Sequence, residues 1–321
     1  MKAPEFWFRK GTTSASLLTP AAALYDLAGR ISRAARTSQT VDAKIICVGN
    51  LVAGGAGKTP VALALAEILR TDDIAFLTRG YGGRETGPLR VDPSHHTARD
   101  VGDEALLLAH AAPTWFSRDR PKGARAAETG GAKIVIMDDG FQNPSLAKNI
   151  ALLVVDGATG FGNGRVMPAG PLRETVRNGL LRADAIVLVG DDKTNATAQI
   201  HNGTPILKAR LVPGPEAQTL SGQRVLAFAG IGRPQKFFDT LTEIGCEIVG
   251  QHAFADHRPY RPEQIMALCE EAAALQAIPV TTDKDLVRLP ADAREMVQTV
   301  SVTLEWDDPA AVTTFLKNRL A

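Results

Sequence analysis

Residues 52–59, VAGGAGKT, nearly match the phosphate-binding loop G-x-x-x-x-G-K-[ST], with valine in the place of the first glycine. The apolar run KIICVG precedes this segment and PVALALAEILR follows it, which predicts the strand, turn and helix that the motif requires. The glycines let the loop point backbone N–H groups at a phosphate, because glycine adopts positive φ at little cost. The predicted nucleotide-binding residues are Val52, Ala53, Gly54, Gly55, Ala56, Gly57, Lys58 and Thr59.

Two side chains of this loop are suited to phosphoryl transfer. Lys58 is expected to reach the terminal phosphates, and the hydroxyl of Thr59 is expected to ligate Mg²⁺. A magnesium site also needs a carboxylate at the end of a neighbouring strand, and KIVIMDDG places Asp138 and Asp139 after an apolar run. Because adjacent strand residues face opposite ways, we expect Asp138 to point at the metal and Asp139 to lie close by. The alternative is that both are turn carboxylates.

Asp103 is the candidate base for phosphoryl transfer to an alcohol, since it begins a predicted helix together with Glu104 in DVGDEALLLAHA. An aspartate in this place can instead cap free N–H groups, and capping would stabilise its charged form and weaken the base. A histidine partner can offset that loss by orienting or sharing the proton, and FADHRPY offers His257. A histidine in a polar loop is more often not catalytic, so the residues alone leave this pair open.

The segment 156–175, DGATGFGNGRVMPAGPLRET, is too rich in glycine and proline for a helix or strand, and it is longer than loops that only connect two elements. It brings Arg173 and Glu174 near the strand ends, where α/β sheets bind their ligands. Arg173 is therefore a candidate to neutralise the transferring phosphoryl group.

Candidate contacts to the second substrate come from two glycine-rich segments. Residues 78–85, TRGYGGRE, resemble a basic hairpin that carries Arg79 and Tyr81, and the long loop adds Asn163. A surface hairpin without a binding role is the alternative.

The composition favours a cytoplasmic protein of two domains. The chain has 321 residues, 45% of them apolar, and a net charge of +1, which argues against a general nucleic-acid binder. The cysteines Cys47, Cys246 and Cys269 are far apart, without the spacing of a disulfide framework or metal site. No apolar run approaches the roughly 20 residues that cross a bilayer, and no cleavable signal is evident. No obligate protein partner is inferred.

Short apolar strands alternate with helices, which predicts an α/β fold with a P-loop NTPase-like parallel sheet covered on both faces. We assign this domain to residues 1–212 and a smaller α/β domain to 213–321. The extended run at 203–221 and the late strand in VQTVSVTLEW are expected to pair as a two-strand linker.

The N-terminal segment allows two interpretations. Phe6, Trp7 and Phe8 lie beside basic residues, and a helix predicted from about 16 to 36 carries apolar residues on one stripe and arginines on another. Such a helix can lie in a membrane interface, or it can be an ordinary helix packed on the domain.

A guanine nucleotide is disfavoured because two motifs of GTPases are missing. TTDKD has Lys284 directly before Asp285, the reverse of the N-K-x-D order, and Gly140 follows Asp139 at once, so that D-x-x-G is missing. ATP with Mg²⁺ is therefore the expected nucleotide.

Taken together, GNLVAGGAGKTP, TRGYGG, VGDE, MDDGFQ, GFGNGRVMPAGPLRE, FADHRPY and TTDKDLVRL closely resemble tetraacyldisaccharide 4′-kinase, the lipid A 4′-kinase of Gram-negative bacteria. The family's loop characteristically lacks the first glycine, and here Val52 occupies that position. The resemblance implies transfer of the γ-phosphate of ATP to the 4′-hydroxyl of a tetraacylated glucosamine disaccharide 1-phosphate.

The resemblance also implies roles for single residues. Asp103 matches the family's base and His257 its partner, while Arg173 and Glu174 match residues at the nucleotide and the metal. The N-terminal helix is implied to rest on the cytoplasmic face of the inner membrane, where the lipid substrate resides.

The competing hypothesis is a membrane-associated P-loop ATPase that acts as a conformational switch. It accounts for the loop, the aspartates and the amphipathic helix. It does not account for Asp103 with His257, or for the long arginine-bearing loop.

Overall fold

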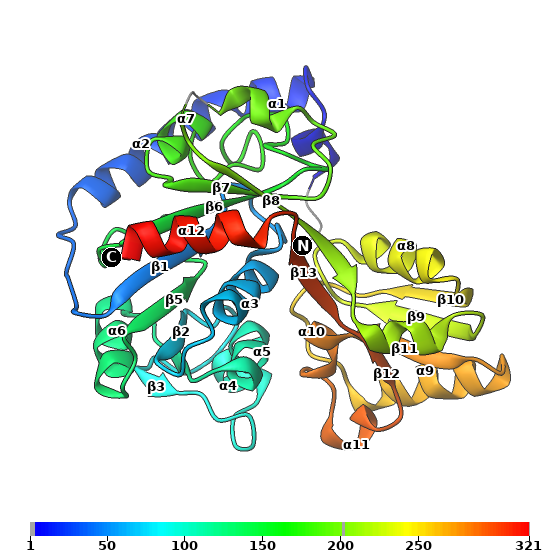
Figure 1. The fold of residues 1–321 in the computed structure, drawn as a ribbon. Coiled ribbons are helices and arrows are strands. Elements are labelled where there is room, and N and C mark those ends of the chain that lie inside the picture. The colour runs from blue at the N-terminus through cyan, green and yellow to red at the C-terminus, as the bar shows by residue number, and fades with distance from the viewer. Residues whose placement is uncertain (1–3, 201–202, 321) are drawn as a thin grey trace.

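The computed structural model describes residues 4–200 and 203–320, which form two sheets with helices on both faces of each (Figure 1). Within these residues the larger sheet has nine strands in the order β13-β8-β7-β6-β1-β5-β2-β4-β3. All neighbours from β8 to β4 are parallel, and the edge strands β13 and β3 are antiparallel. The strands are β1 (Lys44–Gly49), β2 (Ile74–Thr78), β3 (Leu89–Arg90), β4 (Thr114–Phe116), β5 (Ile134–Asp138), β6 (Ile150–Asp156), β7 (Ala185–Val189), β8 (Ile206–Pro213) and β13 (Val302–Trp306).

Alternate residues of the central strands enter separate cores on the two faces of this sheet, as strand geometry requires. Ile46 and Val48 of β1 pack under α3, α5 and α12, whereas Ile45 and Cys47 pack under α6, α2 and the loop after β6. The predicted α/β class with a parallel sheet is confirmed. The helices of this part are α1 (Thr13–Leu17), α2 (Thr19–Ala34), α3 (Lys58–Leu69), α4 (Ala98–Val101), α5 (Asp103–Ala111), α6 (Arg120–Thr129), α7 (Val176–Leu180) and α12 (Pro309–Leu320), with 3₁₀ turns η1 (Glu5–Phe8) and η2 (Ala196–Gln199).

The smaller sheet is wholly parallel, in the order β10-β9-β11-β12. One face packs on Phe237, Phe238 and Leu241 of α8, and the other packs on Ile265 and Leu268 of α9. The elements are η3 (Pro215–Leu220), β9 (Arg224–Ala229), α8 (Pro234–Ile244), β10 (Glu247–Ala253), α9 (Pro262–Ala274), β11 (Ile278–Thr282), α10 (Asp283–Leu286), α11 (Ala291–Arg294) and β12 (Gln298–Val300).

Two antiparallel strands connect the sheets. β8 pairs with β13 from Ala209↔Trp306 to Pro213↔Val302, so the predicted pairing of the linker strands is confirmed (Figure 1). The single strand expected in VQTVSVTLEW is wrong, because the chain divides at Ser301 into β12, which pairs with β11, and β13. Beyond this point Leu304, Val312 and Leu316 join the core of the larger sheet. The boundary between the two domains at residues 212 and 213 stays a prediction. Residues 302–320, which were assigned to the smaller domain, pack on the larger sheet.

The N-terminal helix is shorter than expected and interrupted. α1 ends and α2 begins at Leu18, because Pro20 stands in the first turn of α2, where proline favours a new helix start. Ala22 of α2 is buried, whereas Leu24, Leu27 and Ile31 are between 50 and 69% exposed on one stripe. Among the described residues, no helix has the length and apolar character needed to cross a membrane.

Candidate active site

The phosphate-binding loop connects the end of β1 to α3, which begins at Lys58. Gly54 and Gly57 have φ of 124° and 83°, conformations that side chains strongly disfavour. Val52 keeps negative φ and forms a β-bridge with Leu172, while the N–H of Ala53 donates to the carbonyl of Pro171 at 2.8 Å. The long loop after β6 therefore clamps the start of the phosphate-binding loop, and extended backbone at Val52 serves this pairing.

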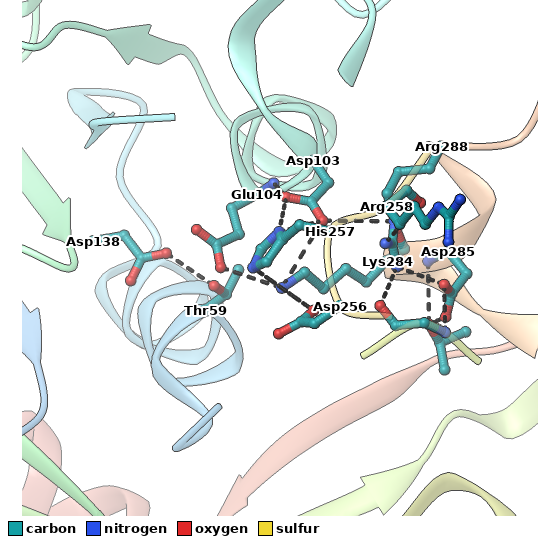
Figure 2. Close-up of polar contacts among 12 residues, drawn as sticks. Thr59, Asp103, Glu104, Asp138, Asp256, His257, Arg258, Lys284, Asp285 and Arg288 are labelled. Atoms are coloured by element: carbon teal, nitrogen blue, oxygen red, sulfur yellow. Dashed lines mark hydrogen bonds and ion pairs between the residues drawn. The ribbon is translucent and has the colours of Figure 1, made fainter. Parts of the chain in front are cut away.

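Thr59 and Asp138 meet where Mg²⁺ was predicted. The Thr59 hydroxyl donates to Oδ2 of Asp138 at 2.9 Å, while Oδ1 of Asp138 is buried without a hydrogen-bond partner in the described structure (Figure 2). Burial raises the pKa of Asp138 to about 7. A carboxylate oxygen without a partner beside a hydroxyl fits a hard cation such as Mg²⁺.

Protein ligands alone do not complete a metal site here. Over residues 4–200 and 203–320, no cluster of three or more His, Cys, Asp or Glu side chains is arranged to hold a metal ion. Magnesium commonly takes one or two protein oxygens and fills its octahedron with phosphate oxygens and water. Thr59 and Asp138 fit that pattern.

Asp139 lies in the turn after β5, with φ of 53°, and faces cations. Its Oδ1 is 2.9 Å from Nη1 of Arg173 and 3.7 Å from Nζ of Lys58. Burial alone would raise the pKa of Asp139, but the charges of Lys58 and Arg173 outweigh it and lower the pKa. Asp139 thus holds together the two cations that were predicted to stabilise the transferring phosphoryl group.

Asp103 is buried at the beginning of α5, where the two α/β units meet (Figure 2). Its two carboxylate oxygens lie 3.1 and 3.0 Å from Nδ1 of His257, which has φ of 57° in the loop after β10. Asp103 also accepts a hydrogen bond from the N–H of Glu104, so the expected capping role is limited to its nearest neighbour. Burial opposes the charge, yet His257, Lys284 and Arg288 together lower the pKa of Asp103.

Lys284 and Arg288 are site residues that sequence reasoning did not assign. Nζ of Lys284 is 3.3 Å from Oε1 of Glu104 and 3.9 Å from Oδ2 of Asp103. Nε of Arg288 is 3.6 Å from the same Asp103 oxygen. The segment TTDKDLVRL contributed to the resemblance and contained the signal, but nothing in its spacing connects it to Asp103.

A second contact between the two units lies beside the phosphate-binding loop. Nη2 of Arg233, before α8, donates to the carbonyl of Gly55 at 3.2 Å and pairs with Asp156 at the end of β6. Arg233 was also missed, because GIGRP carries no motif that identifies an arginine reaching another domain.

The metal role of Glu174 stays a prediction, and its side chain contacts cations and an amide. Its buried carboxylate contacts Nη2 of Arg182 at 2.5 Å, Nε2 of Gln142 at 3.2 Å and Nη2 of Arg33 at 3.6 Å. None of these contacts among the described residues involves Thr59 or Asp138. The ion pair with Arg33 connects the end of the long loop, which carries Glu174, to α2.

The three predicted substrate contacts occupy different surroundings. Tyr81 is 68% exposed, and its ring centroid lies 5.1 Å from that of His257. Arg79 is exposed in the same segment, which is a loop: the predicted hairpin is wrong, because β3 pairs with β4 and not with β2. Asn163 instead donates through Nδ2 to the carbonyls of Phe6 and Ala169, at 3.1 and 2.9 Å, and thereby fastens the N-terminal segment to the long loop.

These positions suit one type of reaction. A loop built to bind phosphate follows β1, and two cations are paired through Asp139 after β5. A buried carboxylate contacts a histidine at the start of α5 (Figure 2). Phosphoryl transfer requires positioning, neutralisation of charge and a group to receive the proton of the attacking hydroxyl.

Known proteins resemble the chain over nearly its whole length. The tetraacyldisaccharide 4′-kinase of Rhodospirillum centenum is 53% identical over 316 residues, covering 96% of this chain and 94% of the relative. That of Gluconacetobacter diazotrophicus is 51% identical over 314 residues, covering 97% and 96%. A crystal structure of LpxK from Aquifex aeolicus, in complex with ATP, superposes with a TM-score of 0.77 at 24% identity, covering 96% of this chain and 99% of that one.

The family model described as tetraacyldisaccharide-1-P 4′-kinase matches residues 14–321. The match includes the phosphate-binding loop, Asp103 and His257 as well as the strands that connect the two units. The resemblance of the sequence motifs is confirmed, and the chain belongs to the tetraacyldisaccharide-1-P 4′-kinase family.

Proposed function

We propose that this protein transfers the γ-phosphoryl group of ATP to the 4′-hydroxyl of tetraacyldisaccharide 1-phosphate, in lipid A biosynthesis. The observation that carries the proposal is the buried Asp103 carboxylate, which His257 holds through Nδ1 where the two α/β units meet. An ATPase that acts only as a switch has no need of a base for an alcohol, and family membership does not favour it.

In the proposed mechanism, the oxygen of the 4′-hydroxyl forms a bond to the γ-phosphorus, and Asp103 receives the proton of that hydroxyl. The bond between that phosphorus and the β–γ bridging oxygen breaks, and its electron pair leaves with ADP. His257 orients the Asp103 carboxylate through its Nδ1–H. Lys58 and Arg173, fixed by Asp139, face the negative charge on the transferring group.

Thr59 and Asp138 would hold Mg²⁺ together with phosphate oxygens of the nucleotide. Magnesium bound there would neutralise part of the negative charge of the nucleotide phosphates. Asp138 is favoured over Asp139 as the direct ligand, since Oδ1 of Asp138 has no partner within the described part of the chain, whereas Asp139 already faces Lys58 and Arg173.

We also propose that the protein binds peripherally to the cytoplasmic face of the inner membrane through α2. Leu24, Leu27 and Ile31 form an exposed apolar stripe, which suits an interfacial helix better than a packed one. Arg30 and Arg36 remain exposed for anionic headgroups, whereas Arg33 lies against Glu174. We further propose that Tyr81 and Arg79 contact the sugar, since the Tyr81 ring lies 5.1 Å from that of His257, tilted by 60°.

The test is incubation with γ-labelled ATP, Mg²⁺ and tetraacyldisaccharide 1-phosphate in detergent micelles, followed by chromatography of the lipid. Label should enter the lipid, and an analogue lacking the 4′-hydroxyl should remain unlabelled. ATP hydrolysis at the same rate with and without lipid, with no labelled lipid, would favour the switch ATPase instead.

A further inference from the structure

Lys284 is the central cation of the contact between the two units, and no motif explains its place. It lies in the one-turn helix α10, which the Thr282 side chain caps through the N–H of Asp285. Its side chain is only 24% exposed and points at the Asp103–His257 pair (Figure 2). Nζ lies 3.4 Å from Nε2 of His257.

The proton positions on His257 follow from its two neighbours. Nδ1 lies within 3.1 Å of both oxygens of Asp103, and an ionised carboxylate only accepts, so Nδ1 carries a proton. An ammonium group only donates, so the contact from Lys284 is a hydrogen bond only if Nε2 keeps its lone pair. Both contacts are satisfied together by a neutral imidazole protonated on Nδ1.

A competing acceptor lies beside the same ring nitrogen. Oδ1 of Asp256 is 3.7 Å from Nε2 of His257 and 3.9 Å from Nζ of Lys284. This oxygen is buried and has no hydrogen-bond partner in the described structure. Without the ammonium, Asp256 would favour a proton on Nε2 and hence a doubly protonated, positive ring.

We propose that Lys284 is a positioning residue that keeps His257 neutral and protonated on Nδ1, so that Asp103 remains the proton acceptor. The proposal rests on the kinase function above, because it assigns how the base of that reaction is maintained. The ring contacts Asp103 of α5, Tyr81 of the loop after β2, Asp256 of its own loop and Lys284 of α10. Glu104 of α5 lies beyond Lys284, and Arg288 lies beyond Asp103.

The balance of protons explains why the tautomer matters. When Asp103 receives the hydroxyl proton, the neutral His257 remains a donor through Nδ1 and gains no charge. A positive His257 would stabilise the ionised form of Asp103 further and make it a weaker base. Lys284 supplies positive charge at 3.9 Å from Asp103 without placing an additional charge on the hydrogen-bonded ring.

The first measurement is nitrogen NMR of the full-length protein with ¹⁵N-labelled histidine at pH 7. The chain has six histidines, and the spectrum of His257→Gln identifies the signal of this ring. We expect one protonated nitrogen, Nδ1, and one nitrogen with a lone pair, Nε2. A ring protonated on Nε2, or on both nitrogens, overturns the proposal.

The second measurement uses Lys284→Met, with Lys317→Met on the exposed face of α12 as the matched control. In Lys284→Met, His257 should gain the second proton at pH 7, and kcat should fall about 10- to 100-fold, as expected for a misplaced catalytic group, while KM for ATP changes little. Adding Asp256→Asn removes the competing acceptor and should restore the neutral ring and part of kcat.

A kcat of Lys284→Met equal to that of the control, or an unchanged His257 spectrum in this variant, overturns the proposal. If Lys284→Met does not fold, Lys284→Ala replaces it, since alanine also removes the donor to Nε2 and the same change of the His257 spectrum is expected. The spectra need no lipid. Failure of the wild-type protein to phosphorylate the lipid would therefore contradict the proposed function alone.

Discussion

The hydroxyl of Thr59 donates a 2.9 Å hydrogen bond to Oδ2 of Asp138, while the other oxygen of that carboxylate is buried without a partner among residues 4–200 and 203–320. The phosphate-binding loop and the end of β5 are thereby joined at one carboxylate. Asp139, one residue further along, turns to Lys58 and Arg173. The two adjacent aspartates therefore have separable tasks, which substitutions can distinguish.

Asp138→Asn should raise the Mg²⁺ concentration that gives half-maximal rate, because an amide oxygen carries no net charge for the cation. The increase should be about 10-fold or more, since even changes outside the ligand shell reach that size. Asp139→Asn should lower kcat with little change in the Mg²⁺ requirement. A Mg²⁺ titration of both variants decides the assignment, and the opposite result would make Asp139 the ligand.

Lys58→Ala should nearly abolish transfer, because it removes a fixed positive charge from the developing transition state. Loss of one such group typically costs ~10²–10³ in rate. Single-turnover kinetics with saturating ATP would measure this loss. A variant with most of the wild-type kcat would show that the loop lysine takes no part in the chemistry.

Asp103→Ala and His257→Ala should each slow transfer, and the double variant should be little slower than the slower single variant. Residues that act as one unit are strongly non-additive, and here Nδ1 of His257 contacts both oxygens of Asp103. The four proteins form a double-mutant cycle in kcat. Fully multiplicative losses would exclude the pairing even if both residues matter.

Local patterns predicted the helices and strands well, since the residues that start, continue and end such an element lie close together in the sequence. Apolar runs and start signals predicted the helix after the phosphate-binding loop and the helix that begins at Asp103, observed as α3 and α5. The break at Leu18 was missed although Pro20 signals a helix start, because the apolar stripe continues across it. Ser301 was missed because the alternation of apolar residues at 300, 302, 304 and 306 continues across it.

The site was predictable only where a motif specifies local geometry. Thr59 meets Asp138 because parallel strands bring their carboxyl ends to one edge. Lys284, Arg288 and Arg233 act across the two units, so their partners depend on how the units pack. Asn163 has a residue type that suits ligand binding, yet its hydrogen bonds hold the N-terminal segment to the long loop. Glu174 forms an ion pair with Arg33 of α2, a partner far along the chain that no motif indicates.

The ion pairs of Asp103 predict how stability depends on acid. The pKa of Asp103 in the folded protein lies below its ordinary 3.8, since its cationic partners outweigh burial. Its contribution is therefore complete above the unfolded value and is lost as the pH falls through the folded value. Asp103→Asn should be less stable than the wild type at pH 7, and the difference should shrink below pH 3.8. Urea unfolding of both proteins at several pH values checks this, and a difference that grows in acid would contradict it.

The exposed stripe of α2 predicts membrane binding that can be separated from catalysis. Replacing Leu24, Leu27 and Ile31 with serine removes apolar groups worth roughly 1–2 kcal/mol each when buried in an interface. Affinity for anionic vesicles should fall about 10²-fold or more, measured by co-sedimentation, and added salt should weaken the remaining binding. Met266→Ser on α9, where the methionine is 46% exposed, is the matched control.

Trp7 is a poor target for this test, although its aromatic neighbours first suggested an anchor. Its Nε1 donates to the carbonyl of Pro168 at 3.0 Å, and its own carbonyl accepts from the N–H of Asn163. Substitution of Trp7 would therefore disturb the loop that carries Arg173, and lost activity would not report membrane release. The α2 serine variant leaves these contacts intact, so it should keep its kcat on substrate in detergent micelles and lose activity only on vesicles. Equal binding of this variant and the Met266 control to vesicles would place the membrane contact elsewhere on the protein.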